Sequence, residues 1–255
     1  MIELTFDPTH IAAIVFDLDG TLYRQEPLRR AMAQRLVRAH VARPLQGWRT
    51  MRALSAYRKA QEHLRAARID EPPSLDLAEA QLRFACERSG VDAASMAQCV
   101  ARWMDHEPLD LLAQHIQPGL IEFLDACRGR ELKLGVLSDY PAEPKLDALG
   151  LGQRFDVVLA AQSPEVSAFK PDPRGLQVAM KRLRVDPQHC LYVGDRPDVD
   201  GTAAAAAGMP CCILTRHTSD SRNWTAVSSF ADLQHVLFTD SRHVGRAAQP
   251  ALHHR

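Results

Sequence analysis

The chain opens with an apolar run that stops abruptly at two acids. Residues 11–16 (Ile-Ala-Ala-Ile-Val-Phe) are apolar and partly β-branched, a pattern typical of a parallel strand buried on both faces. Asp17 and Asp19 follow, and the two-residue period of a strand places their side chains on the same side. Gly20 permits a tight turn, and Thr21 adds a hydroxyl beside the carboxylates. Taken alone, this Asp-x-Asp-Gly string is equally compatible with a solvated turn.

The next stretch, residues 24–115, has the composition of helices and contains no strand-like run. Apolar periodicity predicts helices at 27–42, 47–67, 75–89 and 93–104, separated by Pro44, by the Pro-containing segment at 70–73 and by Gly90. An all-helical insert after the first strand is most simply a second domain. Its many arginines could attract phosphate, but a solvated helix surface is the simpler interpretation.

From Gln117 onwards, strand and helix patterns alternate. Strands are predicted at 132–137, 155–160, 190–193 and 210–214, with helices from Gly119 to about Gly129 and at 145–149, 174–183 and 202–207. This alternation predicts an α/β protein with a parallel sheet covered by helices. We therefore expect a core of residues 1–23 and 116–239, a helical insert at 24–115 and a poorly ordered polar tail at 240–255.

Composition limits the classes of function. The 255 residues carry 31 basic and 31 acidic side chains, so neither a nucleic-acid binder nor a membrane-surface protein is indicated. The sequence contains no 18-residue apolar run and no signal-like N-terminus, which favours a cytoplasmic protein. The six cysteines lack Cys-x-x-Cys spacing, and we expect reduced, buried thiols.

Polar residues follow several of the predicted strands at what would be one edge of the sheet. Asp17 and Asp19 follow the first strand, Ser138 the second and Asp195 the fourth, while Lys170 precedes the helix after the third. Carboxylates without neighbouring His or Cys favour a hard cation such as Mg²⁺. Lysine and hydroxyl groups suit the oxygens of a phosphate held against that cation. The set therefore predicts phosphoryl chemistry.

Four sequence motifs, in order, resemble those of the haloacid dehalogenase-like hydrolase superfamily. They are the segments at 17–21 (Asp-Leu-Asp-Gly-Thr), 137–139 (Leu-Ser-Asp), 170–173 (Lys-Pro-Asp-Pro) and 193–201 (Val-Gly-Asp-Arg-Pro-Asp-Val-Asp-Gly). The resemblance covers about residues 11–214 and points to the phosphatase branch. It implies a Rossmann-like parallel sheet core, the fold of that superfamily, with an inserted α-helical cap of the C1 type.

The resemblance also implies roles for individual residues. Asp17 would be the nucleophile, and Asp19 would protonate the leaving alcohol and then activate water. Mg²⁺ would be held by Asp17, the backbone carbonyl of Asp19, Asp195 and one further acid; Asp198 and Asp200 are both within reach, and we favour Asp200. The groups expected to hold the phosphoryl oxygens are Thr21, Ser138, Lys170 and the backbone N–H of Asp139. The Asp139 carboxylate suits a phosphate poorly, so its side chain is expected to point away.

The predicted function is a Mg²⁺-dependent phosphomonoester hydrolase that acts on a small phosphorylated metabolite through an aspartyl-phosphate. The predicted state is a monomer or a homodimer without nucleic-acid or membrane partners. Two alternatives stay open: a phosphotransferase or sugar-phosphate mutase on the same scaffold, and a non-catalytic binding protein. Asp19 disfavours dehalogenation, which has no leaving alcohol to protonate. Candidate substrate contacts are Tyr23, Arg24, Arg52, Tyr57 and Trp103. For each of them alone a structural role is favoured, and Tyr57 and Trp103 suit the core of the cap better.

Overall fold

The computed structural model describes residues 4–66, 76–217 and 223–238. Its centre is a parallel sheet in the order β3-β2-β1-β4-β5-β6, so the first strand of the chain lies between β2 and β4. The strands are β1 (Ala13–Phe16), β2 (Lys133–Ser138), β3 (Val157–Ala160), β4 (Cys190–Gly194), β5 (Cys211–Leu214) and β6 (Thr225–Val227). All four residues of β1 are buried, as its apolar run predicts. The predicted α/β class is confirmed.

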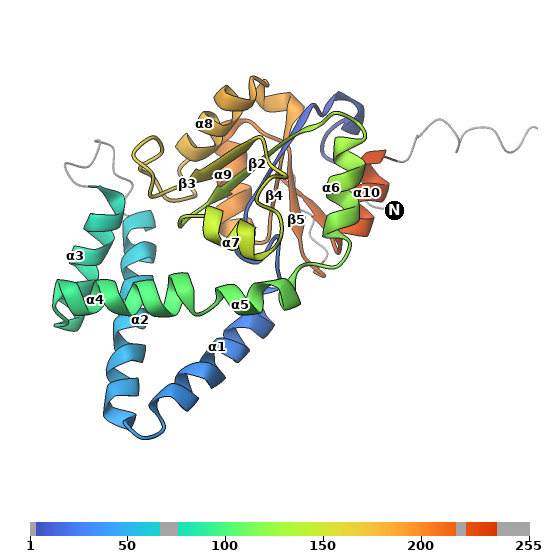
Figure 1. Ribbon diagram of the computed structural model, residues 1–255. Helices are drawn as coiled ribbons and strands as arrows, with labels where there is room; N and C mark the ends of the chain where they lie inside the picture. Colours follow the sequence, from blue (N-terminus) through green and yellow to red (C-terminus); the bar gives the residue numbers. More distant parts are fainter. Residues whose placement is uncertain (1–3, 67–75, 218–222, 239–255) are drawn as a thin grey trace, which may run out of the picture.

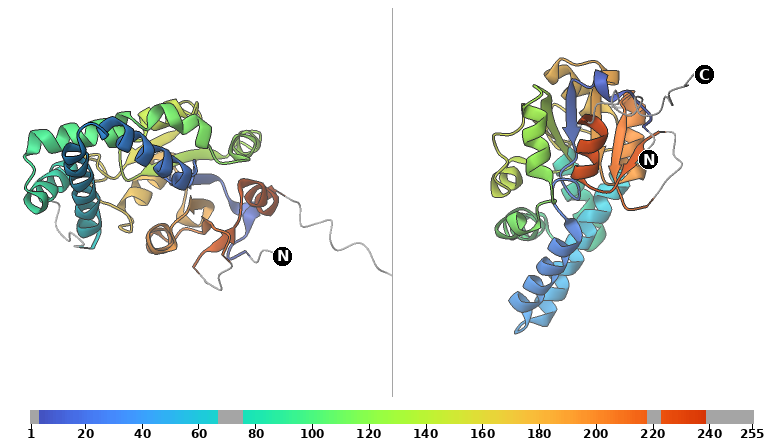
Figure 2. Two further views of the ribbon diagram at one scale, coloured as in Figure 1. Left: turned by 90° about the horizontal axis from the view of Figure 1, so that it is seen from below. Right: turned by 90° about the vertical axis from the view of Figure 1, so that its right-hand side faces the viewer.

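Helices cover both faces of the sheet (Figures 1 and 2). Ile14 and Phe16 of β1 belong to the core beneath α6 (Leu120–Arg128), α7 (Glu143–Ala148) and α10 (Phe230–Phe238). Ala13 and Val15 belong to the core beneath α8 (Arg174–Leu183) and α9 (Thr202–Ala207). The alternation of side chains along the strand thus divides the apolar core into two layers and leaves the strand ends to form a site.

The chain between β1 and β2 forms helices beyond the sheet (Figure 1). They are α1 (Gln25–His40), α2 (Pro44–Ala66), α3 (Leu77–Ser89), α4 (Ala93–Val100), a π-helical segment (Ala101–His106) and α5 (Leu109–Leu112). This insert has small cores of its own, one of which joins Leu36, Leu54 and Trp103. The division into domains at 23/24 and 115/116 stays a prediction.

The two connections between the insert and the sheet run side by side. Tyr23 and Ile116 form an antiparallel bridge. The Arg24 N–H donates to the His115 carbonyl at 2.7 Å, and the Gln117 N–H donates to the Leu22 carbonyl at 3.0 Å. The insert is therefore closed at its base by backbone hydrogen bonds.

Some details differ from the sequence-based expectations. The sheet has a sixth strand, β6, and a following helix, α10; three residues at the edge of a sheet give too short a pattern to detect. All six cysteines are free, as expected, but Cys86 and Cys99 are only half-buried, because they lie on helices of the insert rather than in the sheet. No helix in the described part of the chain is long and apolar enough to span a membrane. The predicted tail at 240–255 lies outside the described residues.

Candidate active site

Three acids meet at the carboxyl edge of the sheet. Asp17 continues β1, and its N–H donates to the Val193 carbonyl of β4 at 2.9 Å. Asp195 directly follows β4, and Asp200 lies in the π-helical segment Pro197–Gly201. Carboxylate oxygens of Asp17, Asp195 and Asp200 lie within 4.8 Å of one another. Residues far apart in sequence therefore form one acidic cluster, as expected where parallel strands end together.

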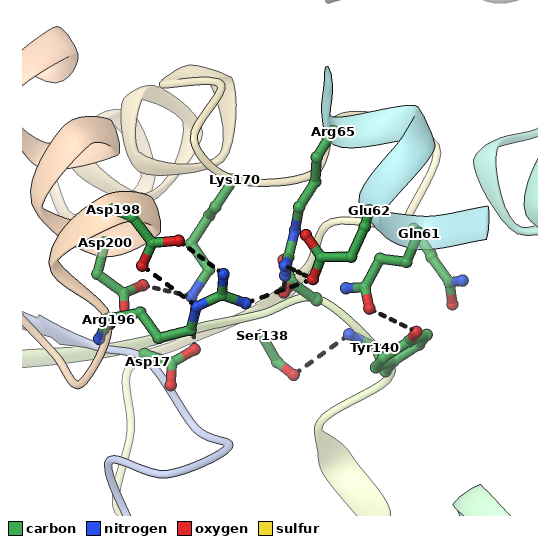
Figure 3. A network of polar contacts seen from close by, with 12 residues as sticks. Asp17, Gln61, Glu62, Arg65, Ser138, Tyr140, Lys170, Arg196, Asp198 and Asp200 are labelled. Atoms are coloured by element: carbon green, nitrogen blue, oxygen red, sulfur yellow. Dashed lines mark hydrogen bonds and ion pairs between the residues drawn. The ribbon is translucent and has the colours of Figure 1, made fainter. Parts of the chain in front are cut away.

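Lys170 reaches this cluster from the loop after β3. Lys170 is 3% exposed, and its ammonium group donates to Asp17, to Asp200 at 2.7 Å and to the Tyr192 hydroxyl at 3.0 Å. The Tyr192 hydroxyl in turn donates to Asp200 at 3.0 Å. The remaining oxygen of Asp200 accepts the N–H groups of Asp195 and Arg196 at 3.2 and 3.0 Å. Asp200 is thus held on both oxygens, and it fixes Lys170 beside Asp17 (Figure 3).

Burial and charge repulsion set the protonation of the acids. Burial raises the pKa of Asp17 well above its usual range, and the charges of Asp200 and Asp195 add to this while Lys170 opposes it. Burial and the Asp200 charge raise the pKa of Asp195 to about 6. Burial also disfavours ionised Asp200, but Lys170, the backbone and the Tyr192 hydroxyl outweigh it and lower its pKa. For Lys170, the carboxylates of Asp17 and Asp200 outweigh burial and raise its pKa.

The cluster fits a divalent cation. Three carboxylates are faced by one lysine ammonium, and within the described ranges Asp195 has no ion-pair partner. The donors are all oxygen atoms, which suit Mg²⁺ rather than a soft metal. By contrast, Asp198 is exposed and pairs with Arg196 at 2.8 Å, so it lies apart from the three acids.

The Asp19 side chain lies outside this cluster. It accepts a hydrogen bond from the Tyr23 hydroxyl and another from Lys145 of α7 at 2.6 Å. Burial disfavours its charged form, but Lys145 and Tyr23 outweigh burial, so the pKa of Asp19 is lowered. Asp19 is therefore ionised at neutral pH and placed to accept a proton.

The predicted phosphate-binding groups have different hydrogen-bond and ion-pair partners. The Thr21 hydroxyl donates to Asp17 at 3.1 Å. The Ser138 side chain is fully buried, and its hydroxyl accepts the Tyr140 N–H at 3.3 Å. The Asp139 carboxylate pairs with Arg65 of α2, whose charge compensates it at the edge of the site.

A chain of ion pairs joins the insert to the sheet beside the acidic cluster (Figure 3). Glu62 of α2 pairs with Arg65 at 2.6 Å and with Arg196 at 3.4 Å. Arg65 reaches Asp139 after β2, and Arg196 follows β4. Helix α2 is thereby attached to the ends of two strands, over the predicted nucleophile.

A cavity of about 680 Å³ lies between the acidic cluster and the insert. Among the predicted substrate contacts, Tyr23 and Trp103 line it, whereas Arg24, Arg52 and Tyr57 do not. Arg52 packs over the Trp48 ring, and Tyr57 is buried in the core of the insert.

Sequence reasoning missed three polar side chains of the site. Tyr192 interrupts an otherwise apolar strand, and this was the one available signal. Lys145 and Arg65 resemble ordinary surface residues of helices, so only the packing of α7 and α2 against the strand ends shows their position.

The fold and the site together define an α/β enzyme whose acidic centre lies at the carboxyl edge of a parallel sheet, beneath a helical insert. The model of the haloacid dehalogenase-like hydrolase family matches residues 11–208, and the chain belongs to that family. Two relatives are each 30% identical. One is a phosphoglycolate phosphatase of Rhodospirillum rubrum, aligned over 80% of this chain and 79% of the relative; the other is a glyceraldehyde 3-phosphate phosphatase of Methanopyrus kandleri, aligned over 78% and 82%.

Solved structures agree on the fold. The Bacillus subtilis hydrolase YfnB, solved with magnesium, superposes with a TM-score of 0.64 over 89% of this chain and 98% of its own, at 14% identity. A phosphatase of the same superfamily from Thermococcus onnurineus superposes with a TM-score of 0.57 over 89% of this chain and 98% of its own, at 22% identity. The predicted family, its Rossmann-like fold and an enzyme of the phosphatase type are confirmed.

Proposed function

We propose that this protein is a Mg²⁺-dependent phosphomonoesterase that acts on a small phosphorylated metabolite through an aspartyl-phosphate. The observation that carries the proposal is the buried Asp17, which is held by Lys170 and Thr21. It lies beside Asp195 and Asp200, and Asp19 follows two residues further along the chain. Relatives named for phosphoglycolate and glyceraldehyde 3-phosphate support small substrates. A cytoplasmic monomer or homodimer is part of the same proposal.

In the first step, a carboxylate oxygen of Asp17 attacks phosphorus and the bond to the leaving oxygen breaks. Asp19 is ionised at rest, so it first takes up a proton from solvent; it then gives this proton to the leaving oxygen, and an alcohol departs. In the second step, Asp19 takes a proton from water, whose oxygen attacks phosphorus and releases phosphate and free Asp17. The lowered pKa of Asp19 keeps it in the ionised form that the second step requires.

The remaining residues would bind the phosphoryl oxygens and the cation. Lys170, Thr21, Ser138 and the Asp139 N–H would hold the phosphoryl oxygens. Asp17, Asp195, Asp200 and the Asp19 carbonyl would hold Mg²⁺. When bound, the ion neutralises phosphoryl charge that otherwise repels the anionic nucleophile.

The test is phosphate release from a panel of phosphorylated metabolites with Mg²⁺, with EDTA and with Asp17→Asn. We expect release to require Mg²⁺ and to fall at least about 1,000-fold in Asp17→Asn, because the nucleophile is removed. Asp147→Asn, an exposed carboxylate on α7, is the matched control and should keep full activity.

Two results would contradict the proposal. Isomerised sugar phosphate without released phosphate would establish a mutase. Folded protein that binds Mg²⁺ but releases phosphate from no compound would favour a binding protein.

A further inference from the structure

The cavity continues from the acidic cluster into the insert. Helices α1 and α2 diverge from their hairpin towards the sheet, so they form two walls (Figure 1). Gln25, Arg29 and Met32 line it from α1, at the spacing of one helix face. Glu62, Arg58 and Ser55 line it from α2 in the same way. Both walls therefore carry an arginine that lines the cavity.

The cations of this cavity fall into two groups. Four of them pair with a carboxylate: Arg65, Lys145, Lys170 and Arg196. Arg29, Arg58 and Lys59 also line the cavity, but within residues 4–66, 76–217 and 223–238 none of these three has an ion pair. The first four cations are thus paired with carboxylates, whereas the charges of Arg29, Arg58 and Lys59 are not balanced by an ion pair.

Arg29 and Arg58 line the same cavity from its two walls. A Cβ at Gly47 would lie 2.8 Å from the Cβ of His40, so α1 and α2 touch there, and Arg29 and Arg58 lie the same number of residues from this contact along their helices. Both side chains reach solvent, but desolvation by the cavity walls lowers the pKa of Arg58, and the positive charge of Arg29 lowers it further. The two guanidinium groups therefore repel each other, and an anion between them would relieve the repulsion.

We infer that Arg29 and Arg58 form a subsite for a second anionic group, a carboxylate or a phosphate, on the leaving alcohol of the substrate. The inference rests on the proposed phosphomonoesterase function. Guanidinium groups bind both anions through paired hydrogen bonds. On α2, Arg58 lies one helical turn, about 5.4 Å, from Glu62, which pairs with Arg196 at the strand ends, so a spacer of a few atoms connects the two anionic groups. The substrate class is a phosphorylated short hydroxy acid or a short bisphosphate.

A pair of probes isolates the second anion. 3-Phosphoglycerate and glycerol 3-phosphate share the phosphate ester and the carbon chain, and differ in a carboxylate against a hydroxymethyl group. We expect kcat/KM to be at least about tenfold higher for 3-phosphoglycerate, and the ratio to fall at least about fivefold in Arg29→Met and Arg58→Met. Arg38→Met, an exposed arginine farther along α1 that does not line the cavity, should keep the ratio. Fructose 1,6-bisphosphate against the two fructose monophosphates tests a phosphate as the second anion.

Calorimetric binding of the same probes to Asp17→Asn gives a readout independent of turnover. The subsite predicts the same preference in Kd. Equal kcat/KM for charged and neutral members of both pairs would overturn the subsite and leave the phosphatase intact. An equal loss for both members in Arg29→Met and Arg58→Met would also overturn it, since the arginines would then act on the transferred phosphate. No release from any probe, with anion-selective binding retained, would overturn the proposed function instead.

Discussion

Asp200 and Asp198 are two residues apart, yet their environments are opposite. Asp200 is 1% exposed and accepts hydrogen bonds from Lys170, Tyr192 and two backbone N–H groups. Asp198 lies at the surface and pairs with Arg196. The π-helical turn at 197–201 directs one acid inwards and leaves the other in solvent. The loss of each charge should therefore have very different consequences.

We expect Asp200→Asn to lower kcat/KM about 10- to 100-fold, because Lys170 loses the carboxylate that orients it and the cation site loses a charge. Asp198→Asn, the matched control, should change kcat/KM less than about twofold, since exposed ion pairs contribute little. Steady-state kinetics, with circular dichroism to verify folding, measures both. Equal losses in the two variants would contradict this assignment.

Asp19 and Lys145 make stability depend on pH. A carboxyl whose pKa is lower in the folded state contributes stability that is fully present above its unfolded pKa, about 3.9, and lost as the pH falls through the folded value. Lys145→Met removes the partner that lowers this pKa. We expect it to cost about 1.5–3 kcal/mol at pH 7 and less at pH 3, because pH 3 lies below the unfolded pKa of Asp19 and part of the stability from its charge is already lost there.

Urea unfolding of the wild type and the variant at both pH values measures this difference. Lys181→Met, an exposed lysine on α8, is the control and should show no pH-dependent difference. A cost that is the same at pH 7 and pH 3 would mean that the Lys145 stem, and not its charge, stabilises the fold.

At the level of elements, the turn after β1 depends on one glycine. Gly20 has φ of 111°, and a Cβ there would lie 2.1 Å from an oxygen of Asp195. The turn after β1 packs against Asp195 after β4, so there is no room for a side chain at position 20. Only glycine permits both the turn and the approach of Asp195.

Gly20→Ala should therefore displace Asp195 and strain the turn. We expect a stability loss of about 1–3 kcal/mol and an apparent Mg²⁺ affinity reduced at least about tenfold. Magnesium titration of activity together with thermal unfolding separates the two effects. Gly150→Ala is a useful control, because it has a similar positive φ of 71° but open space around it, and it should lose stability without losing magnesium affinity.

The elements that could be predicted from sequence are those with a strong local pattern. The run ending at Asp17 and the one ending at Gly194 marked β1 and β4, because strands buried on both faces are apolar throughout. The ends of these two runs also indicated where the acidic residues of the site would lie. Lys145 could not be foreseen as a partner of Asp19, because their contact depends on how α7 packs against a turn more than a hundred residues away.

At the level of the whole molecule, the site lies between two parts of the chain. The sheet supplies the acids and Lys170, and the insert supplies the outer walls of the cavity with Arg29 and Arg58. The ion pairs of Glu62 connect these parts at one side. In the proposed function, chemistry and selection of the leaving group therefore belong to different segments of the sequence.

The backbone hydrogen bonds at the base of the insert bear on how the sequence can change. Arg24 and His115 are hydrogen-bonded there, so the insert is a closed loop in the connection between β1 and β2. The entropy of closing a loop grows slowly, by about 0.6 kcal/mol for each doubling of its length. Changes in the length of the insert that keep its packing against the sheet domain, through Leu28, Leu112 and Leu77, should therefore change the stability of the sheet little. New substrate preferences can arise from such changes, while the catalytic strand ends keep their geometry.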